Sequence, residues 1–170
     1  MTINTIIHKV LKPIANDHLM LNEFGFGDLH NYAKVNALAY PVMWVALNDV
    51  GYKGKGFNYN LSLVFADILK DDLSNTLEIQ SDMISIAADI AAKLFYTDND
   101  YLEVTSDFVF KPFTERFTDL CAGVVMDINI KSLVILSPCD FASIEDLQNP
   151  RLMTEKGEEI IQQNGQHITI

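Results

Sequence analysis

The sequence YPVMWVALNDVGYKGKGFNYNLSLVFA, residues 40–66, contains two strand patterns joined by a glycine-rich segment. Its first part, residues 40–47, is apolar at both alternating sets of positions, which fits a strand covered on both faces or a strand at a subunit contact. From Phe57 to Ala66, large apolar residues alternate with polar or smaller ones, as in a half-buried strand. The glycine-rich residues 51–56 between them favour a turn, because glycine adopts positive φ angles at no steric cost. These patterns together predict a β-hairpin.

The glycine-rich stretch also raises the question of a phosphate-binding loop. A Walker loop needs four residues between its first glycine and a Gly-Lys pair, followed by Ser or Thr and a helix. Here Gly51 and Gly54 are only three positions apart, Gly56 follows Lys55, and the next residues alternate as in a strand. The hairpin turn is therefore preferred. Lys53 and Lys55 are expected at its tip, where they are either solvated or in contact with an acidic neighbour.

N-terminal to the hairpin, the sequence predicts one amphipathic helix and one loop. Apolar residues recur at helical spacing over residues 2–21, with Pro13 as a kink or a stop. They are Ile3, Ile6, Ile7, Val10, Leu11 and Ile14. In FGFGD, residues 24–28, a G-x-G follows no strand and lacks the third glycine of a dinucleotide-binding fingerprint. We predict a fixed loop whose Phe24 and Phe26 fill an apolar site, on this chain or a neighbouring subunit, and we add Trp44 as a candidate interface residue.

C-terminal to the hairpin, residues 71–95 predict the main helix. Its N-cap is expected among Asp71, Asp72, Ser74 and Asn75, residue types that accept hydrogen bonds from a helix N-terminus. The helix carries two apolar groups, so we expect it to contact the sheet and a second surface. The groups are Leu77, Ile84, Ala88, Ala91 and Phe95, and Ile79, Met83, Ile86 and Ile90.

Two more strands are predicted after this helix. Residues 102–110 alternate, and Pro112 marks either the end of that strand or a place at a sheet edge. A clearer alternation runs through residues 120–130, with Val125 as the exception. We predict an α+β fold in which an antiparallel sheet of about four strands is packed by the long helix and the N-terminal helix. The domain is expected to span residues 1–136, and residues 137–170 are expected to form an extended C-terminal arm.

Composition narrows the class of protein. The chain has 170 residues, 49% hydrophobic and 21% charged, as expected for one globular domain. Its net charge of -11 argues against a surface that grips nucleic acid, because phosphate binding needs clustered Lys and Arg. A protein with an acidic inner surface would still be able to surround DNA, because that surface repels the phosphate backbone and lets the DNA slide without being bound.

No catalytic, cofactor-binding or metal-binding residues are predicted. Cys121 and Cys139 form no C-x-x-C motif. The four histidines, which lack metal-ligand spacing and an adjacent nucleophile motif, are His8, His18, His30 and His167. No secretion signal and no run of about 18 apolar residues is present, so neither export nor membrane insertion is expected.

The segment VFKPFTERFTDLCAGVVMDINI, residues 109–130, carries the pattern F-x-P-F-x-x-R-F-x-D-x-x-A-G. The pattern positions are Phe110, Pro112, Phe113, Arg116, Phe117, Asp119, Ala122 and Gly123. Phe113 and Phe117 are suited to anchor the connection between the last two strands in the core. Arg116 is expected to form a forked hydrogen-bond pair with Asp119 or another carboxylate.

Together with YPVMWV and FADILKDD, this pattern resembles small virion proteins of crAss-like tailed phages of Bacteroidetes. The resemblance covers roughly residues 20 to 140 and implies a neck or tail-connector ring protein, similar to tail terminator and tail completion proteins. It implies a homo-oligomeric ring, sixfold or twelvefold, that contacts portal, neck and tail proteins and encircles DNA without sequence-specific binding. Such a protein would be assembled in the host bacterial cytoplasm and reside in the virion. The alternatives are a tail tube or baseplate protein, or a small intracellular hydrolase or ligand-binding module.

Overall fold

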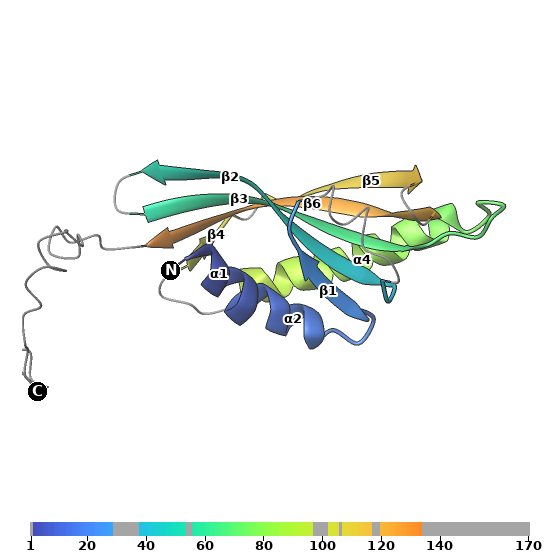
Figure 1. Cartoon of the computed structure of the whole chain (residues 1–170), viewed down its shortest axis with the longest axis horizontal. Coiled ribbons are helices and arrows are strands. Elements are labelled where there is room, and N and C mark those ends of the chain that lie inside the picture. The colour runs from blue at the N-terminus through green and yellow to red at the C-terminus, as the bar shows by residue number, and fades with distance from the viewer. Residues whose placement is uncertain are drawn as a thin grey trace, which may run out of the picture. The chain divides into compact units, whose positions relative to one another are not determined.

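Three long strands form the centre of a mixed sheet: β2 (Val42–Lys53), β3 (Gly56–Ile68) and β6 (Leu120–Leu133). Three shorter strands complete it: β1 (Glu23–Phe26), β4 (Leu102–Val104) and β5 (Val109–Arg116). The computed structural model in Figure 1 describes residues 2–28, 38–53, 56–96, 102–105, 107–116 and 120–133. The helices lie against one face of the sheet, so the α+β prediction is confirmed.

The strand order is β1-β2-β3-β6, and both β4 and β5 pair with the remaining edge of β6. β1 runs parallel to β2, whereas the other described pairs are antiparallel. The prediction of about four antiparallel strands was therefore too low, and it was wrong for β1. The sequence signal failed because β1 is short and one predicted strand is divided into β4 and β5. The predicted arm, residues 137–170, lies outside the described residues and stays a prediction.

The predicted hairpin is confirmed, with a much tighter turn than expected. β2 and β3 pair from Val42 opposite Ala66 to Lys53 opposite Gly56, so only positions 54 and 55 lie between the paired ends. Gly51 is inside β2, opposite Asn58, and does not belong to the turn. The register shifts between Leu47 and Asp49, a bulge that leaves one extra residue on β2.

We call the face of the sheet that the helices cover the inner face and the opposite one the outer face. The inner face supplies most of the hydrophobic core, including every second residue of β6 from Ala122 to Ile130, as predicted. Its other strand residues are Met43, Val45, Tyr59, Leu61, Leu63 and Phe65. The core side chains thus follow the two-residue period of a pleated strand.

The outer face carries a smaller apolar group that we call the outer cluster. Its members are Leu38, Val42, Trp44, Val64 and Ala66, with Tyr40, Phe113 and Val125 packed against them. The apolar character of β2 at both parities therefore reflects a strand covered on both faces. β3 was predicted to be half-buried, but its residues 61–66 are all buried, because Val64 and Ala66 belong to the outer cluster.

The N-terminal segment is one continuous helix with a π-helical centre. It consists of α1 (Ile3–Ile6), the π-helix η1 (Ile7–Leu11) and α2 (Lys12–Asn16). The Lys12 N–H donates to the Ile7 carbonyl, five residues earlier. Pro13 has no N–H to donate, and the wider π turn just before it lets the helix continue to Asn16 without a stop.

The long helix α4 (Thr76–Phe95) confirms the predicted main helix. Its predicted second group packs on the sheet, since Ile79, Met83, Ile86 and Ile90 are all buried. Of the first group only Ala91 is buried, whereas Leu77 is 80% and Phe95 49% exposed. Asn75 occupies the N-cap position, but its Oδ1 accepts from the Lys70 N–H at 2.9 Å. The cap residue therefore fixes the preceding loop and not the first turn of the helix.

β4 and β5 behave as one edge strand with an interruption. Between the pairs Val104–Ile130 and Val109–Asp127, four residues of the edge lie opposite two residues of β6. Because the excess is an even number, residues on both sides of the interruption keep their face, and Val104 and Phe110 both pack on the inner core. Pro112 lies within β5, where an edge position tolerates its missing N–H, as the sequence predicted.

Candidate functional site

Trp44, a predicted interface residue, is buried within the chain and only 6% exposed. It lies on β2 opposite Gly25 of β1, and a Cβ atom at Gly25 would be 2.2 Å from the Trp44 Cε3. The indole Nε1–H donates to the Gly27 carbonyl at 3.1 Å. Residues 24–26 of FGFGD thus belong to β1 and not to the predicted loop, while Gly27 and Asp28 follow the strand. Gly25 leaves room for the indole. In the single chain Trp44 joins β1 to β2 and is not available as a surface contact.

The two aromatic residues of β1 differ in their surroundings. Phe24 is partly buried against the chain's own inner core, which is the apolar site that the prediction sought. Phe26 is half exposed, and its ring meets the His8 ring edge-on with centroids 5.3 Å apart. Only Phe26 therefore offers apolar surface to a neighbour.

Lys53 lies at the end of β2, where its side chain is exposed, and Lys55 lies outside the described residues. The predicted interface residues thus divide into two places. Phe24, Phe26 and Trp44 lie where β1 pairs with β2, with Phe24 and Phe26 on the inner face and Trp44 in the outer cluster, while Lys53 lies at the other end of β2.

The residues of the F-x-P-F…A-G pattern pair with one another across β5 and β6. Phe113 lies opposite Gly123, and Pro112 lies opposite Val124. Phe110 packs on the inner core and Phe113 on the outer cluster, so the two rings cover opposite faces. Phe113 is thus an aromatic residue that lies opposite a glycine across the two strands, a combination known from other sheets.

The remaining pattern residues are only partly described. The Arg116 backbone pairs with Leu120, which places it at the end of β5. Phe117 and Asp119 lie outside the described residues. The predicted pairing of Arg116 with Asp119 therefore stays a prediction.

A polar row that the sequence analysis missed crosses the outer face from β2 to β5. The Asn48 Nδ2 donates to the Ser62 Oγ at 2.8 Å, and the Ser62 hydroxyl donates to the Asp127 Oδ1 at 2.6 Å. The Lys111 Nζ donates to the Asp127 Oδ2. These four residues come from β2, β3, β6 and β5, so side-chain bonds reinforce the backbone ladder across four neighbouring strands.

The electrostatics of this row follow from Asp127. Burial by itself raises the pKa of the Asp127 carboxyl, but hydrogen bonds from Lys111 and Ser62 and the Lys111 charge outweigh burial and lower that pKa below its usual range. A carboxylate with a lowered pKa is a weak general base at neutral pH. The row is thus better suited to holding the strands together than to removing a proton from Ser62.

We expect Asp127→Asn to lower the free energy of unfolding by about 1 kcal/mol at pH 7, because it removes a charge-assisted contact that is partly open to water. The pKa of Asp127 is lowered in the folded state, so its stabilising contribution is present above the unfolded-state pKa and disappears as the pH falls through the folded-state pKa. Urea unfolding of both proteins from pH 7 down to pH 3 should therefore show a difference that shrinks below about pH 4.

The matched control is Glu103→Gln. Glu103 pairs with Lys131 at 2.9 Å, but both side chains are largely exposed. Glu103→Gln should change the free energy of unfolding by no more than about 0.5 kcal/mol at every pH. A pH-independent loss in Asp127→Asn would contradict the charge-based account of the row.

A shallow apolar groove lies between the second half of α4 and the β4–β5 edge, and we call it the α4 groove. Its volume is about 340 Å³. The side chains that line it are Ala88, Ala91, Ala92, Phe95, Tyr96, Phe108 and Phe110. Small alanines on the helix let a partner approach closely, and the aromatic rings provide large apolar contact areas. The sequence did not locate this groove, but the first apolar group of the helix signalled a second contact surface.

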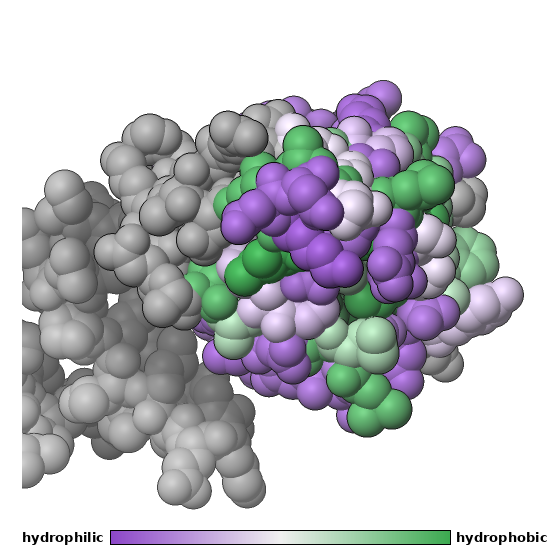
Figure 2. Space-filling model, turned by 90° about the vertical axis from the view of Figure 1, so that its right-hand side faces the viewer, coloured by the Kyte–Doolittle hydropathy of each residue, from purple (hydrophilic) through white to green (hydrophobic). Residues whose placement is uncertain are grey.

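Apolar side chains also reach the surface elsewhere. Figure 2 looks at the end of the sheet that carries the β3–α4 connection, where hydrophobic side chains lie between hydrophilic ones. Ile68, Leu73 and Leu77 are the large exposed hydrophobic residues of that region. Scattered exposed hydrophobic residues are ordinary on a single chain. The contiguous α4 groove is therefore a better candidate for a contact surface than these residues.

The described titratable residues do not gather into a second site. His18 Nε2 lies 3.5 Å from the Asp89 Oδ2 and links the end of α2 to α4, and His8 is exposed on η1. His30, His167 and Cys139 lie outside the described residues, and Cys121 is buried in β6. Among the described residues, no group of three or more potential ligands is placed to hold a metal ion.

The helices in the described part of the chain are too short or too polar to cross a lipid bilayer. Comparison of the sequence with protein-family models and with curated proteins returns no match.

Proposed function

We propose that the chain is a structural virion protein of a tailed phage, which forms a homo-oligomeric ring in the neck or tail and joins portal-side to tail-side components. The observation that carries the proposal is the α4 groove, whose lining is almost entirely apolar. The F-x-P-F…A-G pattern, whose described residues pair across β5 and β6, adds the resemblance to connector proteins.

The form of the groove suits a contact between subunits. Tyr96 and Phe95 stand at its rim with 81% and 49% of their surface exposed. Aromatic residues of this kind are enriched at the centres of protein interfaces, where they lose most of their contact with water. A heterologous contact, in which the groove receives a different surface of the next copy, closes into a ring when the rotation between copies allows it.

Charge fits the same proposal. The chain carries a net charge of -11, so a ring of many copies would present a strongly acidic wall. Such a wall repels the phosphate backbone and lets DNA pass without binding it. Light scattering and negative-stain averages of the purified chain should show closed rings, and a monomer at every concentration would contradict the proposal unless the adjoining neck component restores assembly.

We expect Ala92→Glu to abolish ring formation while the chain remains folded. Ala92 lies exposed on α4 and lines the groove, so a glutamate there would place a charge in an apolar contact. Glutamate is a good helix former, so the free energy of unfolding should change by less than about 0.5 kcal/mol. Size-exclusion chromatography with light scattering and circular dichroism measure the two quantities.

Ser81→Glu is the matched control for this change. Ser81 is an exposed residue on the same side of α4, about three turns earlier, and does not line the groove. The control should still form rings. Equal loss of assembly in both variants would show that added charge, and not the groove, is responsible.

A further inference from the structure

The second half of β2 forms an open sheet edge. β1 pairs with β2 only from Val42 to Val45, and the Gly27 N–H adds one bond to the Val45 carbonyl. No other described strand pairs with β2 on that side, so the backbone of the five residues Asp49–Lys53 is unpaired there within the described structure. We call these residues the edge segment. Unpaired strand edges are templates for pairing with another chain.

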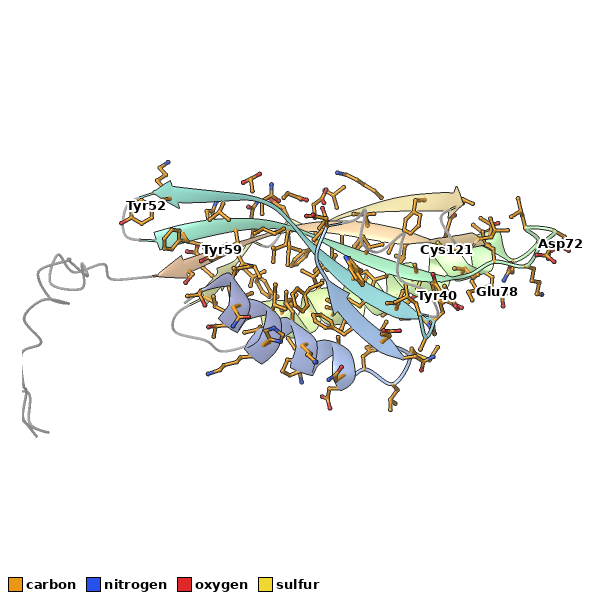
Figure 3. The ribbon with its side chains drawn as sticks, in the orientation of Figure 1. Tyr40, Tyr52, Tyr59, Asp72, Glu78 and Cys121 are labelled. Carbon is orange, nitrogen blue, oxygen red and sulfur yellow. The ribbon has the colours of Figure 1, made fainter. Side chains whose placement is uncertain are left out.

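The inner side of the edge segment is apolar and about half exposed. Val50 and Tyr52 point to this side, opposite Tyr59 and Phe57, and they are 48% and 55% exposed. The Tyr52 and Phe57 rings lie with centroids 5.2 Å apart. Figure 3 shows Tyr52 and Tyr59 at the same end of the sheet, toward the β2–β3 turn. A strand added here would cover two large side chains that water now contacts.

The outer side of the edge segment carries a charged residue at each end and a glycine, which has no side chain, in the middle. Asp49 and Lys53 are exposed, and Gly51 lies between them. The Asn60 Nδ2 donates to the Asp49 Oδ2 at 3.1 Å, so that carboxylate is held in place. A Cβ atom at Gly51 would meet only the Asn58 Cβ, at 3.8 Å. This side therefore offers one negative charge and one positive charge, separated by an unobstructed position.

We propose that the edge segment pairs antiparallel with the same segment of a second copy of this chain, about a two-fold axis at Gly51. Asp49 of one copy then lies opposite Lys53 of the other, and Val50 lies opposite Tyr52. Each of these pairs occurs twice, because the axis exchanges the copies. Opposite charges and pairs of aromatic with β-branched residues are the stabilising cross-strand combinations. The segment is therefore complementary to itself in this single arrangement.

The same side chains disfavour other pairings. A parallel arrangement in the same register would place Asp49 against Asp49 and Lys53 against Lys53. If the register shifted by one residue, Val50 and Tyr52 would lie opposite Asp49, Gly51 or Lys53, which belong to the outer side of the segment. The bulge between Leu47 and Asp49 interrupts the edge and limits the pairing to the five residues of the segment. The occupant with matching charge and apolar pattern is thus a second copy.

This contact goes beyond the proposed ring and does not depend on it. A two-fold contact closes after two copies, whereas a ring requires a heterologous contact. The edge segment lies on β2, while the α4 groove is lined by Phe108 and Phe110 at β5, on the opposite edge of the sheet. The two-fold contact would therefore form a dimer of free chains or join two rings to each other.

Disulfide trapping tests the geometry directly. Opposite residues of an antiparallel pair have Cα atoms about 4.5 to 5.5 Å apart, within the range that a disulfide bridges. Gly51→Cys in a Cys139→Ser background should therefore give a disulfide-linked dimer on mild oxidation, visible on a non-reducing gel. Asn58→Cys in the same background is the control, since residue 58 lies on the same face one strand further in, and its two copies would be about 15 Å apart. Equal crosslinking of both variants, or none in Gly51→Cys, would overturn the proposal.

A charge swap tests the register. Asp49→Lys and Lys53→Asp should each weaken the dimer at least tenfold, measured as the dissociation constant in sedimentation equilibrium, because each places like charges opposite one another twice. The double variant restores opposite charges and should return to within about threefold of the natural chain. If the double variant is as weak as the singles, or the singles dimerise normally, the proposed register is wrong. Ala92→Glu should leave this dimer intact, so failure of the ring and failure of the dimer are separate results.

Discussion

Gly123→Ala is expected to destabilise the chain by about 3 kcal/mol or more, enough to prevent folding in a marginally stable domain. A Cβ atom at position 123 would lie 1.8 Å from the Phe65 carbonyl oxygen and 2.9 Å from the Ala66 Cα. Both atoms belong to the backbone of β3, which is buried and paired on both sides, so neither can move without disturbing the sheet. Soluble yield and the midpoint of urea unfolding measure the effect.

Gly51→Ala is the matched control, because it also replaces a strand glycine with alanine. The nearest atom to its new Cβ lies at an ordinary contact distance of 3.8 Å. Its stability should therefore be unchanged or higher by up to about 1 kcal/mol, since alanine loses less backbone entropy than glycine on folding. If the two variants had equal stability, β6 would not approach β3 as closely as the structure shows.

Gly25→Ala is expected to destabilise the chain by about 2 kcal/mol, because its Cβ would overlap the Trp44 ring. Here the obstructing atom belongs to a side chain, so the effect should depend on that side chain. In a Trp44→Leu background, which is itself less stable, the same glycine substitution should have a penalty at least about 1 kcal/mol smaller. Chemical unfolding of the four proteins of this double-mutant cycle gives the coupling.

Trp44 fluorescence gives a second measure of the same contact. Gly25→Ala should shift the emission maximum to longer wavelength, since a displaced indole loses burial and the hydrogen bond to the Gly27 carbonyl. Additive effects in the cycle and an unchanged spectrum would contradict the account of β1 docking through the indole.

Much of the fold could be predicted from residue periodicity. The structure confirms the alternation of β6 and the hairpin around Gly51, because each of these strands packs one face on the inner core. The N-terminal apolar stripe is likewise confirmed, and the helix continues past Pro13 after a π turn. Periodicity is most reliable where the two faces of an element differ in burial, as along β6 from Val124 to Ile130.

Periodicity failed where burial does not alternate or an element is short. β1 has only four residues, and Gly25 within it and Gly27 just after it gave the segment the composition of a loop. The two apolar groups of α4 could not be ranked from the sequence, because only the sheet decides which group it covers. The polar row could not be found either, since Asn48, Ser62, Lys111 and Asp127 are distant in sequence and meet only when four strands assemble.

Candidate site residues were predicted with less success. Trp44 was predicted as a candidate interface residue in a strand that is apolar at both parities, but its indole instead fills the space left by Gly25. The sequence placed Lys53 near an exposed turn, and that position is at the end of the edge segment. Whether an exposed aromatic faces a neighbour or its own chain depends on contacts between distant residues, which composition does not encode.

The two long edges of the sheet differ in one more respect. Pro112 on β5 offers no N–H, and the interruption before Val109 breaks the run of that edge. Strand addition is therefore less favourable at β5 than at β2, which disfavours stacking of copies through both edges of the sheet. We expect Pro112 to slow the growth of cross-β fibrils in a concentrated solution of this chain.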